Sequence, residues 1–267
     1  MTICAAPRGQ PPIHETSQST GQALCDIKSV DIKTFLLKLK KTPLHPQWFA
    51  FHGEVSYLRE ICGELEGTVS DIGCADGKPK SFLPPTARYL GIDYYRTATD
   101  WYLTKPDLFA DAQALPLKDN CVDHTLLLDV LEHLPEPDQC LREIHRTLKP
   151  GGSLTIQVPF LYPVHDAPLD FHRWTRFGLS RAAEKHGYTV KKERVLGHPL
   201  ESAALNTNIA LSKTVLNWIR DRNILSIAIL ILPFAILVIN TLAWAGARLS
   251  KADPIMPHSY RVTWIKQ

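Results

Sequence analysis

The sequence predicts an α/β fold, a mostly parallel sheet covered by helices, and two observations support this prediction. Short apolar runs alternate with stretches of helical spacing between residues 68 and 196, which is typical of strand–helix–strand units. A glycine-containing turn follows the first apolar run, at the sheet edge where open α/β folds bind ligands. The expected structure is therefore a ligand-binding α/β domain.

Composition limits the class of protein. The chain has 267 residues, 45% hydrophobic and 21% charged, so it is long enough for one large domain with appendages. With 14 Gly, 20 Pro and 6 Cys it is not collagen, a disulfide scaffold or a wholly disordered chain. A net charge of +3 without a basic run indicates no nucleic-acid partner. The scattered cysteines fit a reducing compartment and structural roles.

The segment before the first strand is expected to contain a leader and two helices. Residues 1–22 are rich in Pro, Gln, Ser and Thr, which predicts disorder. Apolar residues at helical spacing then predict one helix over 26–41, ended by Pro43 and Pro46, and a second helix over 55–65.

The other elements follow in order along the chain. Lys149-Pro150-Gly151-Gly152 ends the helix expected over 138–148, and Gly187 ends the helix expected over 175–186. Because such helices connect consecutive strands, the strands on either side of them are expected to run parallel. The expected strands are 68–72, 89–93, 108–110, 122–129, 153–158, 188–196 and 260–265.

Acidic residues at successive strand ends predict a nucleotide-type ligand. Val69 to Gly77 is a strand that enters a Gly-containing turn, which lets the backbone approach a ligand. Asp93 ends the second strand about 20 residues later, a placement that suits hydrogen bonds to ribose hydroxyls. Asp111 follows the third strand. Each feature alone also occurs in ordinary turns and helix caps, but their order and spacing together indicate a ligand site.

Longer segments carry a more specific pattern: DIGCADG, YLGID, DAQALPLKDNCVD, LLLDVLEHLPEPDQCLREIHRTLKPGG and the strand ending in VPF. With them the chain resembles class I S-adenosylmethionine-dependent methyltransferases of the type 11 group, which are ubiquinone/menaquinone-methyltransferase-like. The segment YPVHDAPLDFHRWTRFGL is similar to a bacterial subset with a C-terminal hydrophobic insertion. The resemblance covers residues 45–200 and the closing strand. It implies a Rossmann-like seven-stranded sheet, mostly parallel, whose last strand is antiparallel.

The resemblance implies that one group of residues surrounds the methionine part of S-adenosylmethionine. Asp71, Gly73 and Cys74 would border it from the glycine turn. Asp129, at the end of the fourth strand, would lie beside the sulfonium. The family commonly has Gly where this chain has Ala75, and a methyl group there is expected to oppose a positive φ.

A second group is implied for the nucleoside. Asp93 would hold the ribose hydroxyls, while Asp111 and the backbone of Ala112 would contact adenine. The remote alternative is a nicotinamide-dependent oxidoreductase, whose G-x-G-x-x-G fingerprint opens a long helix. This chain lacks that glycine spacing, and Lys78-Pro79-Lys80 is expected to shorten the helix after the turn.

Five polar residues are candidates for catalysis. An oxygen or nitrogen acceptor needs a base, whereas an activated carbon needs a polarising donor. His133 either faces the methyl donor or bonds to a loop, and Arg173 either anchors an anionic acceptor or pairs with Asp170. The spacing of the histidines and aspartates after the fifth strand follows no recognised metal-ligand pattern, so no metal is expected. The candidates are His133, His165, Asp170, His172 and Arg173.

One apolar segment interrupts the pattern. Residues 223–247 contain no Asp, Glu, Lys or Arg but 13 Leu, Ile, Val or Phe residues, and basic residues flank both ends. Their insertion into a bilayer is favourable by roughly 4 to 8 kcal/mol before polar residues offset it. Because the strand 260–265 must return to the sheet, we predict a re-entrant helical pair broken at Pro233. A single membrane span is the alternative.

These observations predict an S-adenosylmethionine-dependent methyltransferase at the cytoplasmic face of the membrane. The expected acceptor is a small or lipid-type molecule, such as a quinone, a lipid or a lipid-linked sugar, and the apolar segment is expected to contact lipid. The alternative from another class is a non-catalytic membrane-attached module that keeps the fold. The expected organisation is a leader (1–22), a helical cap (23–66), a methyltransferase domain (67–200), a hydrophobic insertion (201–250) and a return segment (251–267).

Overall fold

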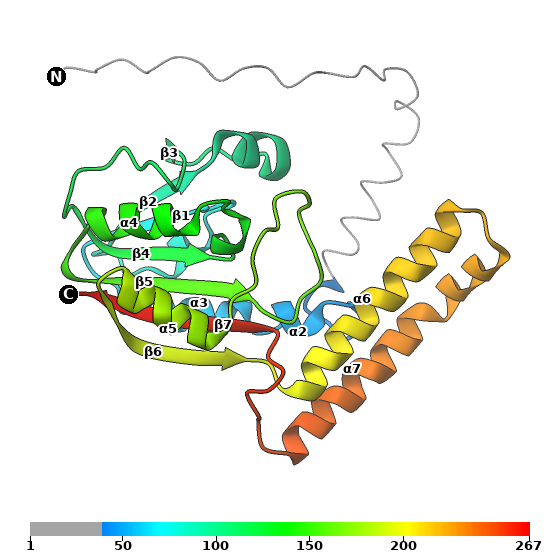
Figure 1. Ribbon diagram of the computed structural model, residues 1–267. Coiled ribbons are helices and arrows are strands. Elements are labelled where there is room, and N and C mark those ends of the chain that lie inside the picture. Colours follow the sequence, from blue (N-terminus) through cyan, green and yellow to red (C-terminus); the bar gives the residue numbers. More distant parts are fainter. Residues whose placement is uncertain (1–38) are drawn as a thin grey trace, which may run out of the picture. The chain divides into compact units, whose positions relative to one another are not determined.

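The computed structural model describes residues 39–267 of the chain. The expected leader over 1–22 and most of the expected helix over 26–41 lie outside the described residues. Within 39–267 the chain forms a sheet, the helices that cover it and a long helical hairpin (Figure 1).

Seven strands form one sheet: β1 (Thr68–Ile72), β2 (Arg88–Asp93), β3 (Leu108–Phe109), β4 (Val122–Leu128), β5 (Leu148–Pro159), β6 (Tyr188–Leu196) and β7 (Ser259–Lys266). Their order across the sheet is β3-β2-β1-β4-β5-β7-β6. The pairs from β3 to β5 are parallel, and β7 is antiparallel to both of its neighbours, β5 and β6. The expected Rossmann-like sheet with an antiparallel last strand is confirmed.

The sheet is covered by helices on both faces, as a parallel sheet requires. Leu126 and Leu127 are neighbours on β4, so their side chains point to opposite faces, and both are fully buried. Leu127 belongs to the same cluster as Leu141 of α4 (Pro137–Thr147), whereas Leu126 packs with Cys62 of α3 (Glu54–Cys62). Burial of such a side chain stabilises the fold by about 1.5–3 kcal/mol.

Two boundaries differ from the expected ones for local reasons. β5 begins at Leu148, five residues earlier than expected, because Leu148 already pairs with Val122 of β4. The helix α4 therefore ends at Thr147. After β1 the chain forms only a 3-10 helix, η1 (Lys78–Phe82), with Pro79 in its first turn. The expectation of a shortened helix at this place is confirmed.

A helical hairpin lies between β6 and β7. It consists of α6 (Pro199–Arg220), a short 3-10 helix η4 (Ile224–Leu230) and α7 (Leu232–Leu249), and α6 and α7 lie side by side (Figure 1). The expected break near Pro233 is present, since η4 ends at Leu230 and α7 begins at Leu232, but the two long helices that lie side by side are α6 and α7. Pro233 occupies the first turn of α7, where its missing N–H group costs nothing, so it begins the helix.

Both ends of the hairpin meet at the sheet. Leu196, the last residue of β6, pairs with Ser259, the first residue of β7. β7 then runs between β6 and β5, with Ser259 also opposite Pro159. The prediction that the chain returns to its own sheet after the apolar segment is confirmed.

A buried polar contact fastens the hairpin to the chain before β1. Asn208 of α6 and Asn240 of α7 are both fully buried, and the Asn208 Nδ2 donates to Asn240 Oδ1 at 2.8 Å. Asn240 Nδ2 in turn donates to the backbone carbonyls of Pro43 at 2.7 Å and His45 at 3.1 Å. The middle of the hairpin is therefore held by hydrogen bonds that an apolar side chain cannot replace.

Candidate functional site

A cavity of about 810 Å³ opens at the carboxyl ends of β1, β2 and β4. Five of the seven residues expected to bind the cofactor line it: Gly73, Asp93, Asp111, Ala112 and Asp129. This edge of an open α/β sheet is where such folds bind nucleotides, because the strand ends and the loops after them converge there. The volume lies within the usual range of ligand pockets, which is about 300–1,000 Å³.

The turn after β1 is held against β2 by its backbone. Gly73 N donates to Ile92 O at 2.8 Å, and Gly73 has a φ of +71°. A Cβ at this position would lie 2.3 Å from Val130 Cγ2, so no larger residue fits without movement of Val130. Glycine is therefore required here both by conformation and by space.

Ala75 adopts the conformation that its side chain was expected to oppose. Its φ is +46°, in the left-handed region, which costs a non-glycine residue about 1–2 kcal/mol. The Ala75 N–H group donates to Asp93 Oδ2 at 2.8 Å. A hydrogen bond to a charged group stabilises by about 1.5–3 kcal/mol, enough to offset the strain. Alanine therefore adopts the positive φ despite the strain, because this bond holds the turn.

Asp93 and Asp111 present carboxylates to the cavity from two neighbouring strands. Asp93 also accepts from the Tyr94 N–H group at 2.7 Å, and burial raises its pKa while the backbone donors lower it. Asp111 accepts from the backbone N–H group of Gln113 at 2.8 Å. Each carboxylate keeps a lone pair for a ligand, since a carboxylate has about four acceptor sites.

Asp71 and Cys74 do not line the cavity, although both were expected to border the ligand. Asp71 is buried and accepts from the Tyr89 hydroxyl at 2.7 Å. Burial raises the pKa of Asp71 to about 6. Cys74 is also buried, which raises the pKa of its thiol to about 12. Both residues support the turn from beneath, and they reach a ligand only through the backbone of that turn.

A chain of polar contacts connects the last strand to the cavity. Asp129 has a φ of +55°, and its Oδ2 accepts from Gln157 Nε2 at 2.7 Å. Gln157 Oε1 accepts from Arg261 Nη2 at 2.7 Å, and the Arg261 guanidinium lies 4.0 Å from the centre of the Tyr57 ring. Sequence reasoning missed Tyr57, Gln157 and Arg261, because no local motif surrounds them.

The five catalytic candidates separate into two groups. His133 and His165 line the main cavity, while Asp170, His172 and Arg173 line a separate cavity of about 540 Å³. Arg173 Nη2 donates to Asp170 Oδ2 at 2.7 Å, and this bond holds the pKa of Asp170 well below its usual range. Arg173 also donates to the backbone carbonyls of Tyr162 and Pro163. Of the two alternatives for Arg173, the structure contains the pairing with Asp170 that holds the loop.

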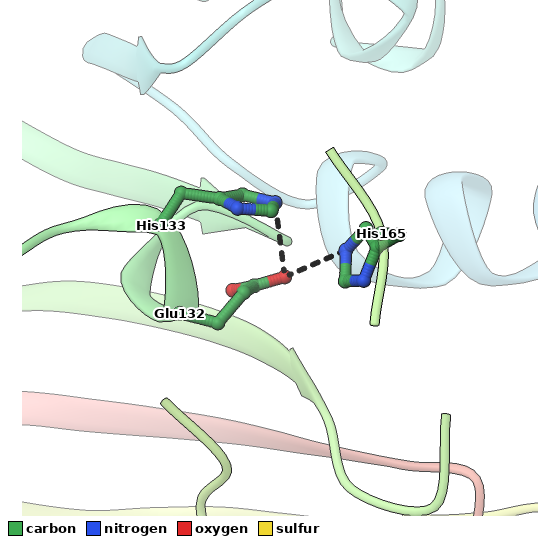
Figure 2. Close-up of side chains that lie close together, drawn as sticks. All are labelled: Glu132, His133 and His165. Carbon is green, nitrogen blue, oxygen red and sulfur yellow. Dashed lines mark ion pairs between the residues drawn. The ribbon is translucent and has the colours of Figure 1, made fainter. Parts of the chain in front are cut away.

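Glu132 lies between His133 and His165, although sequence reasoning passed over it. Its side chain is fully buried, and Figure 2 shows it between His133 and His165. Glu132 Oε1 lies 3.7 Å from His133 Nε2 and 3.9 Å from His165 Nε2. Within residues 39–267 neither carboxylate oxygen has a hydrogen-bond partner, and burial raises the pKa of Glu132 well above its usual range. Only its place directly before His133 in LEHL signalled it.

The sheet order, the glycine turn and the acids at successive strand ends define a Rossmann-like methyltransferase fold. The model of the methyltransferase domain family, type 11, matches residues 70–156. An uncharacterized methyltransferase of Mycobacteroides abscessus is 32% identical over 196 residues, which cover 65% of this chain and 71% of that protein. This chain belongs to the same methyltransferase family.

Other relatives match over shorter lengths. A ubiquinone/menaquinone biosynthesis C-methyltransferase of Salmonella arizonae is 34% identical over 95 residues, 34% of this chain and 38% of that protein. The chain spans 58% of the length of mycobacterial methyltransferases that it matches at 30% identity. Among solved structures, the (4+2)-cyclase SpnF has a TM-score of 0.53 at 18% identity, covering 90% of this chain and 94% of its own. That likeness concerns the fold alone.

Proposed function

We propose that this protein transfers a methyl group from S-adenosylmethionine to a small or lipid-linked acceptor. The observation that carries the proposal is convergence: Gly73, Asp93, Asp111 and Asp129 come from four different segments and line one cavity. The residues fit the cofactor. The turn brings Gly73 to the cavity wall, and Asp93 keeps acceptor sites for the ribose hydroxyls.

When bound, S-adenosylmethionine would supply an electrophilic methyl group: the acceptor's electron pair forms the new bond, and the sulfur keeps the pair of the broken C–S bond and leaves as a neutral thioether. The protein has to align the acceptor in line with that methyl group and exclude water. Tyr57, Trp101 and Tyr102 form an aromatic wall of the cavity and serve this purpose. If the acceptor atom carries a proton, His133 and His165 are the cavity bases that receive it.

The proposed acceptor is a quinone, a lipid or a lipid-linked sugar. Two features support this class. The cavity wall includes Gly197 and Glu201 at the base of the hairpin, so the cavity adjoins the element whose far end carries the apolar segment. One relative, 34% identical over 95 residues, is named for ubiquinone and menaquinone biosynthesis.

We further propose that the hairpin tip enters the cytoplasmic leaflet of a membrane. One described helix, Leu232–Leu249, is long and apolar enough to cross a bilayer, and 17% of it is buried. Soluble proteins also contain single helices of this kind. The side chains at the tip of the hairpin, which comprises η4 and the first turn of α7, give more specific support. Ile224, Leu230 and Phe234 are 87%, 76% and 69% exposed, and Arg222 precedes them. Exposed apolar groups next to a basic residue favour an interfacial position.

A re-entrant arrangement is favoured over a single span. The hairpin leaves the sheet after Leu196 and returns to it at Ser259, so both ends lie on the same side of any membrane that the tip enters. A span would place these paired residues on opposite sides. The tip then tethers the cavity close to membrane-dissolved acceptors.

The cofactor assignment is tested by calorimetric titration of the full chain in lipid nanodiscs with S-adenosylmethionine and, separately, NADH. Truncation of residues 223–250 is unsuitable, since it would remove Asn240 and its buried partners. We expect binding of S-adenosylmethionine and a roughly 10- to 100-fold loss with Asp93→Ala, because hydrogen bonds to a charged group are removed. Asp76→Ala changes an exposed acid of the same turn and should bind normally.

Two results would overturn the assignment: no binding of S-adenosylmethionine to the wild-type chain, or binding of NADH in its place. Transfer itself is followed with a methyl-labelled donor and a bacterial lipid extract as acceptor pool. Label in the lipid fraction would support methyl transfer to a lipid-type acceptor. Binding without transfer to any fraction supports the non-catalytic module.

The membrane proposal is tested by flotation of the protein with vesicles of phosphatidylglycerol and phosphatidylcholine. Phe234→Asp at the tip should abolish flotation, whereas Phe177→Asp, a similarly exposed phenylalanine on α5 (Arg176–Lys185), should not. A C-terminal tag should be digested only from the cytoplasmic side. Digestion only from the outer face would refute the re-entrant arrangement. Equal flotation of both variants would refute the proposal that the hairpin tip binds the membrane.

A further inference from the structure

Two of the histidines that line the cavity, His133 and His165, are each held in one tautomer. His133 Nδ1 lies 2.9 Å from Leu169 O, and a carbonyl oxygen only accepts, so this nitrogen carries the hydrogen. His165 Nδ1 faces Asp170 Oδ2 at 3.2 Å and Pro163 O at 3.3 Å, again only acceptors. Each neutral imidazole therefore keeps its lone pair on Nε2.

Three lone pairs then converge on one point. The two Nε2 atoms lie 3.7 and 3.9 Å from Glu132 Oε1, and all three atoms lie within 4.8 Å of one another (Figure 2). The Glu132 carboxylate is fully buried and has no donor among residues 39–267. A single proton satisfies only one pair of these acceptors, whereas a cation satisfies all three.

We propose that Glu132, His133 and His165 bind a divalent transition-metal ion of the zinc type. Two histidines and one glutamate are a ligand set of catalytic zinc sites, which leave a fourth position open. Ligand atoms about 2.0–2.1 Å from a tetrahedral ion lie about 3.3 Å apart, so the two distances from Glu132 Oε1 have to shorten by about 0.4 and 0.6 Å and the two Nε2 atoms have to approach each other as well.

The surroundings of the ligands match such a site. Ligand histidines usually donate their other ring nitrogen to a carboxylate or a backbone carbonyl, which fixes the ring and raises its basicity. His133 does so with Leu169 O, and His165 with Asp170. Asp170 is itself held by Arg173, which gives the pairing of these two residues a purpose at the main cavity.

The proposed metal site is open on the side of the main cavity. All three ligands line the main cavity, so the open coordination position faces the space that Asp129 borders. An ion there would occupy the Nε2 atoms that could otherwise receive a proton. It would instead bind an acceptor through oxygen and lower the pKa of that group, so that the acceptor loses its proton to solvent before methyl transfer. This role rests on the proposed methyl transfer, whereas the metal site itself does not.

The spacing of the ligands explains why the sequence predicted no metal. Glu132 and His133 are adjacent, and His165 follows in a loop after β5. No ligand motif has this pattern. The loop brings His165 back because the Phe171 and His172 N–H groups donate to Glu132 O at 2.9 and 3.2 Å.

The test uses the full-length protein, stripped with a chelator and titrated with Zn²⁺, and with Co²⁺ for its visible absorption. We expect one equivalent to bind, and an affinity weaker by about 100-fold or more in Glu132→Gln and His165→Ala, because each loses one of three ligands. His172→Ala, on the same loop but outside the cluster, should bind as the wild type does. Mass spectrometry of the eluted metal gives the stoichiometry.

The proposal is overturned if the wild-type chain binds no Zn²⁺ at micromolar concentration, or if Glu132→Gln and His165→Ala keep full affinity. Circular dichroism of each variant separates loss of ligands from loss of folding, and Glu132→Asp, which keeps a carboxylate, should retain part of the affinity. Titration with S-adenosylmethionine with and without Zn²⁺ tests the proposed function independently, since either binding can fail alone.

Discussion

The cavity edge of the sheet and the tip of the hairpin distribute polar and apolar side chains in opposite ways. At the cavity, buried Asp93 and Glu132 lie among apolar strands, where low polarity shifts their pKa values upward. At the tip, Ile224 and Leu230 are exposed and no charge occurs from residue 223 to 247. The first arrangement suits chemistry on a bound molecule, and the second suits contact with an apolar surface.

This comparison also separates stability from function. At the sheet edge Gly73, Asp93 and Asp129 are held by hydrogen bonds, so substitutions there disturb both folding and binding. At the tip, η4 contains no buried residue, so substitutions of its exposed side chains should leave folding intact and alter only what the tip touches. Matched pairs of identical residues test this difference directly.

The largest effect is expected from glycine substitutions at the turn. Gly73→Ala places a Cβ 2.3 Å from Val130 Cγ2 at a φ of +71°, and we expect a loss of about 4 kcal/mol in unfolding free energy. Gly151→Ala has a similar φ of +76° but open space, and should lose only about 1 kcal/mol. Urea denaturation compares the two, and calorimetry should show weaker S-adenosylmethionine binding in Gly73→Ala alone. Equal losses would mean that space at the turn is unimportant.

A pair of isoleucines compares the two regions next. Ile156 on β5 is fully buried in the main core, and Ile156→Ala should cost about 3 kcal/mol. Ile224 is 87% exposed, and Ile224→Ala should change the free energy of unfolding by less than about 0.5 kcal/mol. Thermal and urea unfolding in detergent measure both. A large cost at Ile224 would show that the tip packs against something within the chain.

The protonation of Asp71 makes the free energy of unfolding depend on pH. Its pKa is about 6 in the folded chain and 3.8 ordinarily, so the folded state binds the extra proton between these values. The stabilisation is fully present below about pH 4 and is lost as the pH rises through about 6, a change of about 2–3 kcal/mol. Asp71→Asn should lack it, because an amide does not titrate.

The measurement is urea denaturation of the wild type and Asp71→Asn between pH 4 and pH 7. The difference in unfolding free energy should move in favour of the variant as the pH rises. Tyr89 can still donate to the amide oxygen of the substituted side chain, so the variant keeps its hydrogen bond. A constant difference across this range would contradict the raised pKa.

The smallest effect is expected at the polar chain behind Asp129. Arg261→Met should weaken S-adenosylmethionine binding about tenfold, because Gln157 loses the donor that orients it towards Asp129. Arg194 lies opposite Arg261 on β6 but is half exposed, and Arg194→Met should bind normally. Calorimetry at constant pH distinguishes them. Equal binding by both variants would show that Asp129 needs no support from β7.

Most of the sheet could be predicted because strand and helix periods are local. β1 and β6 have the expected bounds, and the other strands differ by a few residues at their ends. The helix α6 could not be predicted, because its buried polar residue Asn208 finds its partner on α7. The position of this polar residue on the buried face of α6 is explained only by the packing of α7 against it.

For the cavity, too, the sequence predicted the residues that belong to local motifs and missed those whose partners are distant in sequence. Gly73, Asp93 and Asp111 follow strands in a recognisable order, so the sequence located them on one edge. Asp71 was placed correctly in the chain but not in the cavity, since a side chain on a strand points to one face or the other depending on register. Glu132 and Arg261 escaped notice because each acts with partners that are distant in sequence.

By itself the sequence determined the alternation of strands and helices, the sheet edge at which the cavity lies and the presence of one apolar segment. These properties depend on neighbouring residues, whose spacing is written directly in the chain. Only the tertiary structure decided that Pro233 begins a helix, that Ala75 adopts a positive φ and that His165 meets Glu132. Those outcomes depend on long-range contacts, and their energies exceed the local preferences that opposed them.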